Sequence, residues 1–198
     1  TGGGEHRRRS AARRIRPGAL VRSVEGMDIT TSANEIRAEH LTRRFGDVTA
    51  VDDVSLTIPG GRMTGFVGGN GAGKTTTMRM IMGVLQPTEG QVLWQGRPIT
   101  ADDRRSIGYM PEERGLYPKQ KVGEQLVHLA RLAGLSAADA RTSVEEHLER
   151  LGLAHRAGDP VEKLSLGNQQ RVQVIAAVMT RPAALVLDEP FSGLDPDA

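Results

Sequence analysis

The sequence predicts an α/β domain, and three features support this fold class. A short apolar run, MTGFVG (63–68), leads into a glycine-rich loop and then into a segment with apolar residues at helical spacing. A second apolar run, ALVLDEP (184–190), occurs much later and is typical of a strand buried on both faces. Strand, loop, helix and a later parallel-type strand favour a sheet covered by helices.

Most other strands are expected before residue 112. In EIRAEHLTRRFG (35–46), Ile36 and Ala38 fall on one face of a strand. The stretch VSLTIPGG (54–61) alternates apolar and polar residues and then ends in a turn. The segments QVLWQG (91–96) and SIGYMP (106–111) complete the set of short strands.

Helical spacing marks three further parts of the chain. The first is residues 78–85, directly after the glycine-rich loop. The second is residues 121–155, which contain two amphipathic stretches, with Ser136 as the expected N-cap of the later one. The third runs from about residue 169 to 180 and ends before Pro182. Residues 119–180 are therefore expected to form a helical subdomain.

Composition separates the N-terminus from the rest of the chain. The 198 residues contain no cysteine and only 3% aromatic residues, which predicts an aliphatic core and suits a reducing compartment. Residues 1–26 carry seven arginines and two glutamates, a net charge of +5 in a chain whose total is +2. We expect residues 1–34 to be a disordered Arg-rich leader or a gene-model extension upstream of Met27, and residues 35–198 to be the domain.

The glycine-rich stretch GGNGAGKTTT (68–77) fits the P-loop pattern G-x-x-x-x-G-K-[ST]. Backbone N–H groups of such a loop wrap a polyphosphate, and the following helix N-terminus favours anions. Lys74 is expected to reach the β- and γ-phosphates, and the Thr75 hydroxyl to bind Mg²⁺. The expected nucleotide-binding residues here are Gly68, Gly69, Asn70, Gly71, Ala72, Gly73, Lys74, Thr75 and Thr76.

Two acids follow the apolar run at 185–187. Asp188 ends this expected strand, which is where a carboxylate positions magnesium in P-loop enzymes. Glu189 comes next and is expected to polarise the attacking water. Two acids at a buried strand end are costly unless a cation or a proton-transfer role offsets them.

The segment KLSLGNQQRVQ (163–173) resembles the signature motif LSGGQQQR of ATP-binding-cassette (ABC) ATPases. SGLDP (192–196) resembles the family's D-loop, RRFGDVTAVDDVSL (43–56) its opening segment, and IGYMPEERGLYP (107–118) the stretch around its Q-loop. The motifs occur in the family's order from about residue 35 onward. The resemblance is greatest to ATPase subunits of bacterial exporters, in which a separate membrane protein carries the substrate.

The resemblance implies a P-loop NTPase core with a mixed or parallel sheet, an antiparallel β subdomain and a helical subdomain that carries the signature motif. It also implies that Phe45 stacks on adenine, and that Lys74, Glu112 and Glu189 act in catalysis, with ATP as ligand. Mg²⁺ would be held by Thr75, Glu112 and Asp188. A second ATP-binding subunit would pair head to tail and present its Ser165, Gly167 and Asn168 to the nucleotide.

The remaining implications concern partners and location. An integral membrane permease subunit is expected, with no direct contact to nucleic acid. The protein is expected in the cytoplasm, peripheral to the inner face of the cell membrane. No apolar run of the sequence approaches the length of a membrane span.

Several positions depart from the family's pattern. Glu112 stands where the Q-loop has glutamine, and we hypothesise that it keeps a metal-sensing role. Leu166 and Asn168 replace signature residues, and Gly69 replaces a common proline. The sequence ends at Ala198, before the position of the family's switch histidine, so a C-terminally truncated domain is expected that binds nucleotide weakly and hydrolyses it poorly.

Other classes of function remain as alternatives. A soluble ABC-type ATPase acting on the ribosome or nucleic acid would use the Arg-rich N-terminus. A P-loop kinase or GTPase would leave LSLGNQQR (164–171) without a role, and the guanine-specifying [NT]-K-x-D is absent from the sequence. A pure interaction module would not explain the intact set of Lys74, Thr75, Asp188 and Glu189.

Overall fold

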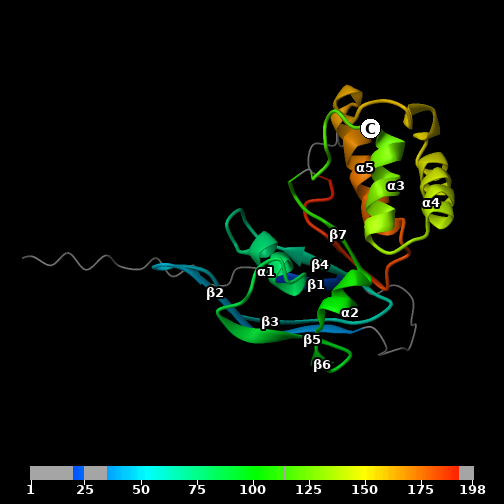
Figure 1. Cartoon of the computed structure of the whole chain (residues 1–198). Coiled ribbons are helices and arrows are strands. Elements are labelled where there is room, and N and C mark those ends of the chain that lie inside the picture. Colours follow the sequence, from blue (N-terminus) through cyan, green and yellow to red (C-terminus); the bar gives the residue numbers. More distant parts are fainter. Residues whose placement is uncertain (1–19, 25–34, 114, 192–198) are drawn as a thin grey trace, which may run out of the picture.

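The computed structural model describes residues 20–24, 35–113 and 115–191, which form an α/β structure with three sheets. The first sheet pairs β1 (Leu20–Val24) with β4 (Met63–Val67) in antiparallel orientation. The third pairs β7 (Ile107–Met110) with β8 (Ala184–Leu187) in parallel, as the sequence predicted for the later strand. Figure 1 shows the strands gathered in one part of the molecule and three long helices in another.

The second sheet is the antiparallel subdomain. Its order is β3-β2-β5-β6, built from β2 (Ile36–Phe45), β3 (Val48–Ile58), β5 (Glu89–Trp94) and β6 (Arg97–Pro98). All its pairings are antiparallel, and the register between β2 and β3 shifts at several bulges. The antiparallel subdomain that the resemblance implied is therefore confirmed.

The first helix covers this strand-rich part. Helix α1 (Lys74–Ile81) begins directly after the glycine-rich loop, and its Met80 and Ile81 are buried. These side chains pack with buried residues of β2, β5, β7 and β8 in one core, which includes Ile36, Trp94 and Val186. This shared core fixes the P-loop relative to β8, the strand that directly precedes Asp188.

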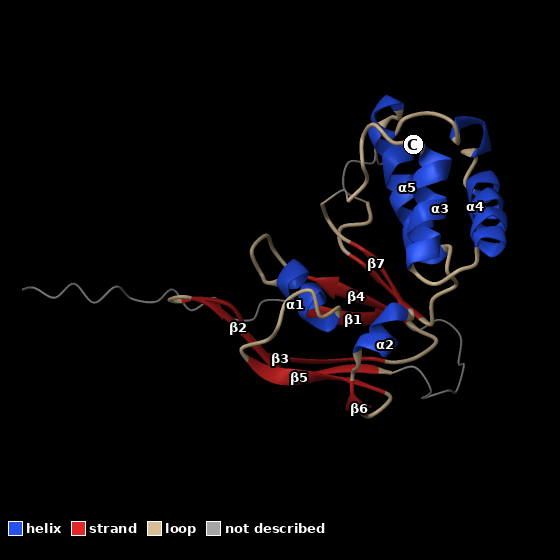
Figure 2. Cartoon of the chain, in the orientation of Figure 1, coloured by secondary structure: helices blue, strands red, loops and turns tan. Residues whose placement is uncertain are grey.

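Three helices form a separate core. They are α3 (Val122–Leu132), α4 (Ala137–Arg150) and α5 (Leu166–Val178), with two short 3₁₀ turns, η2 (Ala154–Arg156) and η3 (Val161–Lys163), before α5 (Figure 2). Their apolar faces bury a second cluster that includes Leu126, Val144 and Ile175. Ser136 caps α4 by accepting from the Asp139 amide at 3.1 Å, as predicted.

The structure differs from the sequence predictions at several elements. Residues Leu20–Val24 form β1, within the range 1–34 for which a disordered leader or a gene-model extension was expected. Strand β6 and helix α2 (Ala101–Arg105) were not predicted; Thr100 and Asp103 form a reciprocal capping box at the start of α2. Helix α5 begins three residues earlier than expected, because Ser165 caps it. The D-loop segment 192–196 lies outside the described residues.

No helix in the described ranges is both long enough and apolar enough to cross a bilayer.

Gly108 gives a test of how β7 packs on α5. A Cβ on Gly108 would contact the Ala177 carbonyl oxygen and would lie 2.7 Å from Leu185 Cδ1. We expect Gly108→Ala to lower the free energy of unfolding by about 1–3 kcal/mol, since the backbone carbonyl of Ala177 cannot move without distorting α5. Urea denaturation measures this. Gly158→Ala is the control, because a Cβ there meets nothing within 4 Å and should change stability little.

Candidate functional site

The glycine-rich loop adopts a backbone that requires glycine at two positions. Gly71 and Gly73 have φ angles of 78° and 81°, in the left-handed region that side chains disfavour. Gly73 also packs closely, because a Cβ there would lie 2.8 Å from the Ala50 carbonyl oxygen. At Gly69, by contrast, a Cβ would meet nothing within 4 Å, so the glycine in place of proline is not required by packing.

Lys74 is the first residue of α1, and its ammonium turns back onto the loop. Its Nζ donates to the carbonyl oxygens of Gly68 at 2.9 Å and Gly69 at 3.4 Å. The same Nζ lies 3.7 Å from a Glu189 carboxylate oxygen. The Lys74 side chain is only 15% exposed, so its ammonium group is held against the loop and is largely shielded from solvent.

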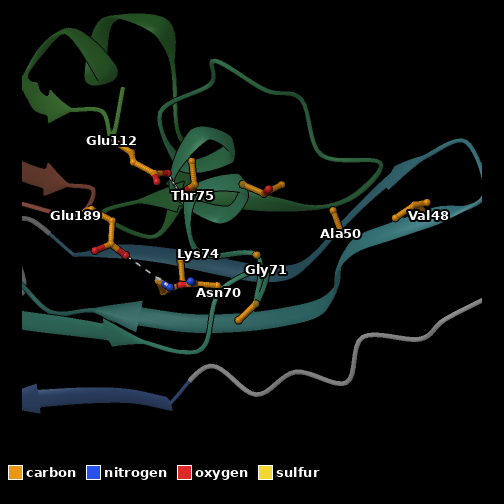
Figure 3. Close-up of a pocket in the computed structure, with 11 residues that line it drawn as sticks. Val48, Ala50, Asn70, Gly71, Lys74, Thr75, Glu112 and Glu189 are labelled. Atoms are coloured by element: carbon orange, nitrogen blue, oxygen red, sulfur yellow. Dashed lines mark hydrogen bonds and ion pairs between the residues drawn. The ribbon is translucent and has the colours of Figure 1, made fainter. Parts of the chain in front are cut away.

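Thr75 and Glu112 contact each other beside the glycine-rich loop. The Thr75 hydroxyl donates to Glu112 Oε2 at 3.2 Å, although 37 residues separate the two in the sequence. Glu112 follows β7, and Thr75 lies in the first turn of α1 (Figure 3). The contact places Glu112, which stands where the family's Q-loop has glutamine, next to the P-loop threonine.

Asp188 follows β8 and is almost completely buried, with 1% of its surface exposed. Its backbone amide donates to the Met110 carbonyl at 2.9 Å, which extends the β7–β8 pairing. Neither carboxylate oxygen has a hydrogen-bond partner among the described residues. Burial raises the pKa of Asp188, as do the nearby charges of Glu112 and Glu189, while the Thr75 hydroxyl and Arg79 oppose this rise.

Glu189 differs from its neighbour in exposure. Its side chain is 45% exposed and turns toward Lys74, so only the first of the two adjacent acids is buried. Its φ angle is 50°, which is unusual for a residue other than glycine. The Glu189 carboxylate is therefore accessible to water, whereas that of Asp188 is not.

These residues surround a cleft of about 360 Å³. Among the expected site residues, the cleft is lined by Asn70, Gly71, Ala72, Gly73, Lys74, Thr75, Thr76, Glu112 and Glu189. Val48 and Ala50 of β3 line it as well and were not predicted. The sequence offered little signal for them, since they differ from other strand residues only in facing the loop. Gly68 and Gly69 adjoin the cleft through their contacts with Lys74, and Asp188 directly precedes Glu189 in the chain.

Phe45 lies at the end of β2, paired with Val48 across the hairpin, and does not itself line the cleft. Phe45 is 47% exposed, and the Arg43 guanidinium lies over its ring at 4.6 Å from the ring centre. The pairing with Val48 places Phe45 at the edge of the cleft. This position is compatible with the stacking role that the resemblance implied.

The signature segment lies away from this cleft. Ser165 caps α5 by accepting from the Asn168 amide at 3.3 Å, so the segment does begin a helix. Neither Ser165, Gly167 nor Asn168 lines the cleft that the P-loop forms. Leu166 is 54% exposed and is not among the residues with positive φ, so it replaces glycine without backbone strain. Within one chain the structure does not bring the signature segment and the P-loop together.

Asp188 leads to a prediction about stability. In the absence of magnesium and nucleotide, Asp188→Asn is expected to raise the free energy of unfolding by roughly 1–3 kcal/mol, because a neutral amide replaces a buried carboxylate that lacks partners. The sign with pH follows from the raised pKa. In the folded protein Asp188 keeps its proton at pH values above 3.8, where the same group in the unfolded chain has lost it. The free energy of unfolding therefore falls as the pH rises above 3.8 and through the raised pKa of Asp188.

Urea denaturation between pH 4 and 8 checks this prediction. In Asp188→Asn the free energy of unfolding should decline less with rising pH, because the contribution of Asp188 is removed. In Asp47→Asn, a change at an exposed acid, the decline should be that of the wild type. A lower stability of Asp188→Asn without magnesium would contradict the interpretation.

The strand-to-loop-to-helix arrangement, the cleft and the buried acid at the end of β8 define a P-loop nucleotide-binding domain. Comparison with known families agrees, since residues 51–192 match the family described as "ABC transporter". The chain belongs to this family, as one of its ATP-binding domains.

Individual relatives carry the same class of name. The chain is 53% identical over 158 residues to the ABC transporter ATP-binding protein YhaQ of Bacillus subtilis, covering 80% of this chain and 53% of YhaQ. It is 36% identical over 182 residues to the probable multidrug ABC transporter ATP-binding protein YbhF of Escherichia coli, covering 90% of this chain and 31% of YbhF. The chain thus spans about half the length of the first of these relatives and about a third of the second.

A solved structure supports the fold directly. CbiO1 of Clostridium perfringens, described as part of the ABC transporter complex CbiONQ, aligns with a TM-score of 0.68 at 28% identity. The alignment covers 82% of this chain and 68% of CbiO1. The α/β fold with an antiparallel subdomain and a helical subdomain is therefore that of ABC ATP-binding subunits.

Proposed function

We propose that this chain binds and hydrolyses ATP in order to drive solute transport through a separate membrane subunit. The observation that carries the proposal is the arrangement around one cleft of Lys74, Thr75, Glu112 and Glu189, with the buried Asp188 beside them. A cation, a hydroxyl and carboxylates at the start of a helix form the donor set that phosphoryl transfer uses.

Binding of the triphosphate begins with the loop. Gly71 and Gly73 hold the backbone open beside the start of α1, where N–H groups and the helix dipole attract anions. The Lys74 ammonium exchanges its carbonyl partners for phosphate oxygens. This exchange also weakens its attraction to Glu189, which is then free to act on water.

The residues present fit a magnesium ion. Asp188 offers two buried oxygens without partners, and Thr75 and Glu112 add a hydroxyl and a carboxylate. No three acidic or imidazole side chains in the described ranges cluster closely enough to hold a metal alone, so phosphate oxygens of the substrate are needed to complete the donor set. When bound, the ion would neutralise charge that develops on the phosphates.

Glu189 is proposed as the general base. It is half-exposed at the rim of the cleft, and it has a single described cation, Lys74, within 4.0 Å. From this position its carboxylate would accept a proton from the attacking water as the water oxygen bonds to the γ-phosphorus and the bond to the leaving ADP breaks. Glu112, which accepts from Thr75, senses the state of the phosphate and metal instead.

Pairing of two copies is part of the proposal. The N-terminus of α5, capped by Ser165, lies outside the cleft of its own chain. In a head-to-tail pair, Ser165 and the amides near Gly167 would reach the γ-phosphate held by the other copy. ATP would then stabilise the closed pair, and hydrolysis would favour its opening.

The membrane partner and the direction of transport are also proposals. The description of CbiO1 as part of a transporter complex supports a membrane subunit that receives the motion of the helical subdomain. Export is our prediction of the direction of transport. A cytoplasmic location at the inner face of the membrane follows from the same reasoning.

Two measurements test the proposed function. Isothermal titration with Mg-ATP, followed by light scattering, should show ATP binding and nucleotide-dependent pairing of the full chain. Affinity purification from membranes should recover an integral membrane protein. Recovery of RNA at low salt, without a membrane protein, would favour an ATPase that acts on nucleic acid and would overturn the transport proposal.

A further inference from the structure

The backbone at Glu189 is held in an uncommon conformation. Its φ angle of 50° lies in the left-handed region, where residues other than glycine, asparagine and aspartate are rarely found. A residue stays in such a conformation only when the surrounding structure holds it there. Contacts of the residues on either side, Asp188 and Pro190, can supply this constraint.

The residue before Glu189 is fixed by the sheet. The Asp188 amide donates to the Met110 carbonyl at 2.9 Å and so continues the ladder between β7 and β8. Asp188 directly follows Leu187, the last residue of β8.

The residue after Glu189 is fixed by the helical subdomain. The Gln170 side-chain amide donates to the Pro190 carbonyl at 2.9 Å. Gln170 lies in the second turn of α5 and is 6% exposed, so water competes little for this hydrogen bond. The bond joins α5, the helix that Ser165 caps, to the segment that carries Glu189.

We propose that Gln170 is a positioning residue for hydrolysis, which fixes Glu189 in its strained backbone conformation by holding the Pro190 carbonyl. The inference rests on the proposed role of Glu189 as general base. Under this proposal α5 has two roles. Ser165 at its N-terminus faces the nucleotide of the other copy, and Gln170 in its second turn holds the general base of its own chain. A shift of α5 on pairing would thereby move Glu189 relative to the water that it activates.

The test compares two glutamines of one helix. Gln170→Met keeps the length and burial of the side chain and removes the donor to Pro190. Gln173→Met is the matched control, because Gln173 is 5% exposed on the same helix and its Nε2 has no hydrogen-bond partner among the described residues. The full chain is used, and steady-state ATP hydrolysis and amide hydrogen exchange are measured for each variant.

In Gln170→Met we expect kcat to fall by about 10–100-fold, since a small displacement of a catalytic group costs this much. KM should change by less than about threefold, because phosphate binding does not involve Pro190. The Asp188 amide should exchange faster in Gln170→Met and at the wild-type rate in Gln173→Met. Should Gln170→Met not fold, Gln170→Asn, whose amide is one methylene shorter, takes its place in the same measurements.

The outcomes separate the two proposals. Absence of ATP binding and hydrolysis in the wild type would refute the proposed function, while the exchange data would still decide whether Gln170 holds this segment. Unchanged exchange at Asp188 in the Gln170 variants would overturn the positioning role. Equal losses of kcat in the Gln170 and Gln173 variants would also overturn it, because they would indicate a general effect of altering α5.

Discussion

Glu189→Gln is expected to lower the rate of ATP hydrolysis by about 10²–10⁴-fold, the range typical for removal of a general base. The amide has almost the same shape and can occupy the same half-exposed position beside Lys74, but it cannot take a proton from water. Binding of ATP should persist, since Lys74 and the loop are unchanged and lose a competing negative charge 3.7 Å from Nζ. The variant should therefore accumulate the ATP-bound pair.

Single-turnover phosphate release and size-exclusion chromatography with Mg-ATP measure these two effects. Glu113→Gln is the matched control, since Glu113 is adjacent to Glu112 but its side chain is 88% exposed and does not line the cleft. The test also separates Glu189 from Glu112. A normal rate in Glu189→Gln together with a large loss in Glu112→Gln would assign the base to Glu112, the acid that contacts Thr75.

Lys74→Ala is expected to weaken ATP binding by roughly ten- to hundredfold, the equivalent of losing one charge-assisted hydrogen bond to a phosphate. The loss of turnover should be larger, because the ammonium also offsets the charge that develops in the transition state. The structure adds a further reason. Lys74 bonds to the Gly68 carbonyl from within the loop, so the alanine variant loses a contact that orders the loop before ATP arrives.

Titration with a slowly hydrolysed ATP analogue measures the affinity without turnover. Lys119→Ala is the control, because Lys119 is exposed and does not line the cleft. Thermal denaturation should confirm that Lys74→Ala is folded. An affinity equal to that of wild type would mean that the triphosphate does not bind at this loop.

Local patterns in the sequence were sufficient for much of the fold and for the cleft. The P-loop spacing, the apolar strand before Asp188 and the N-cap at Ser136 each depend on residues within a few positions of one another. This is why the strands β2–β5, β7 and β8, the long helices and the loop residues from Asn70 to Thr76 could be predicted. The capping box at Thr100 and Asp103 is also local, and it could have revealed α2.

Other features depend on contacts between distant segments, so only the tertiary structure decided them. The pairing of β1 with β4, the contribution of Val48 and Ala50 to the cleft, and the contact of Thr75 with Glu112 all join residues separated by many positions. The burial of Asp188 beside an exposed Glu189 and the bond from Gln170 to Pro190 likewise follow from how α5 and β8 pack. The sequence by itself determined which groups are available for chemistry, because the residues of each motif lie close together along the chain. The tertiary structure determined their exposure and partners, because these are set by packing between elements.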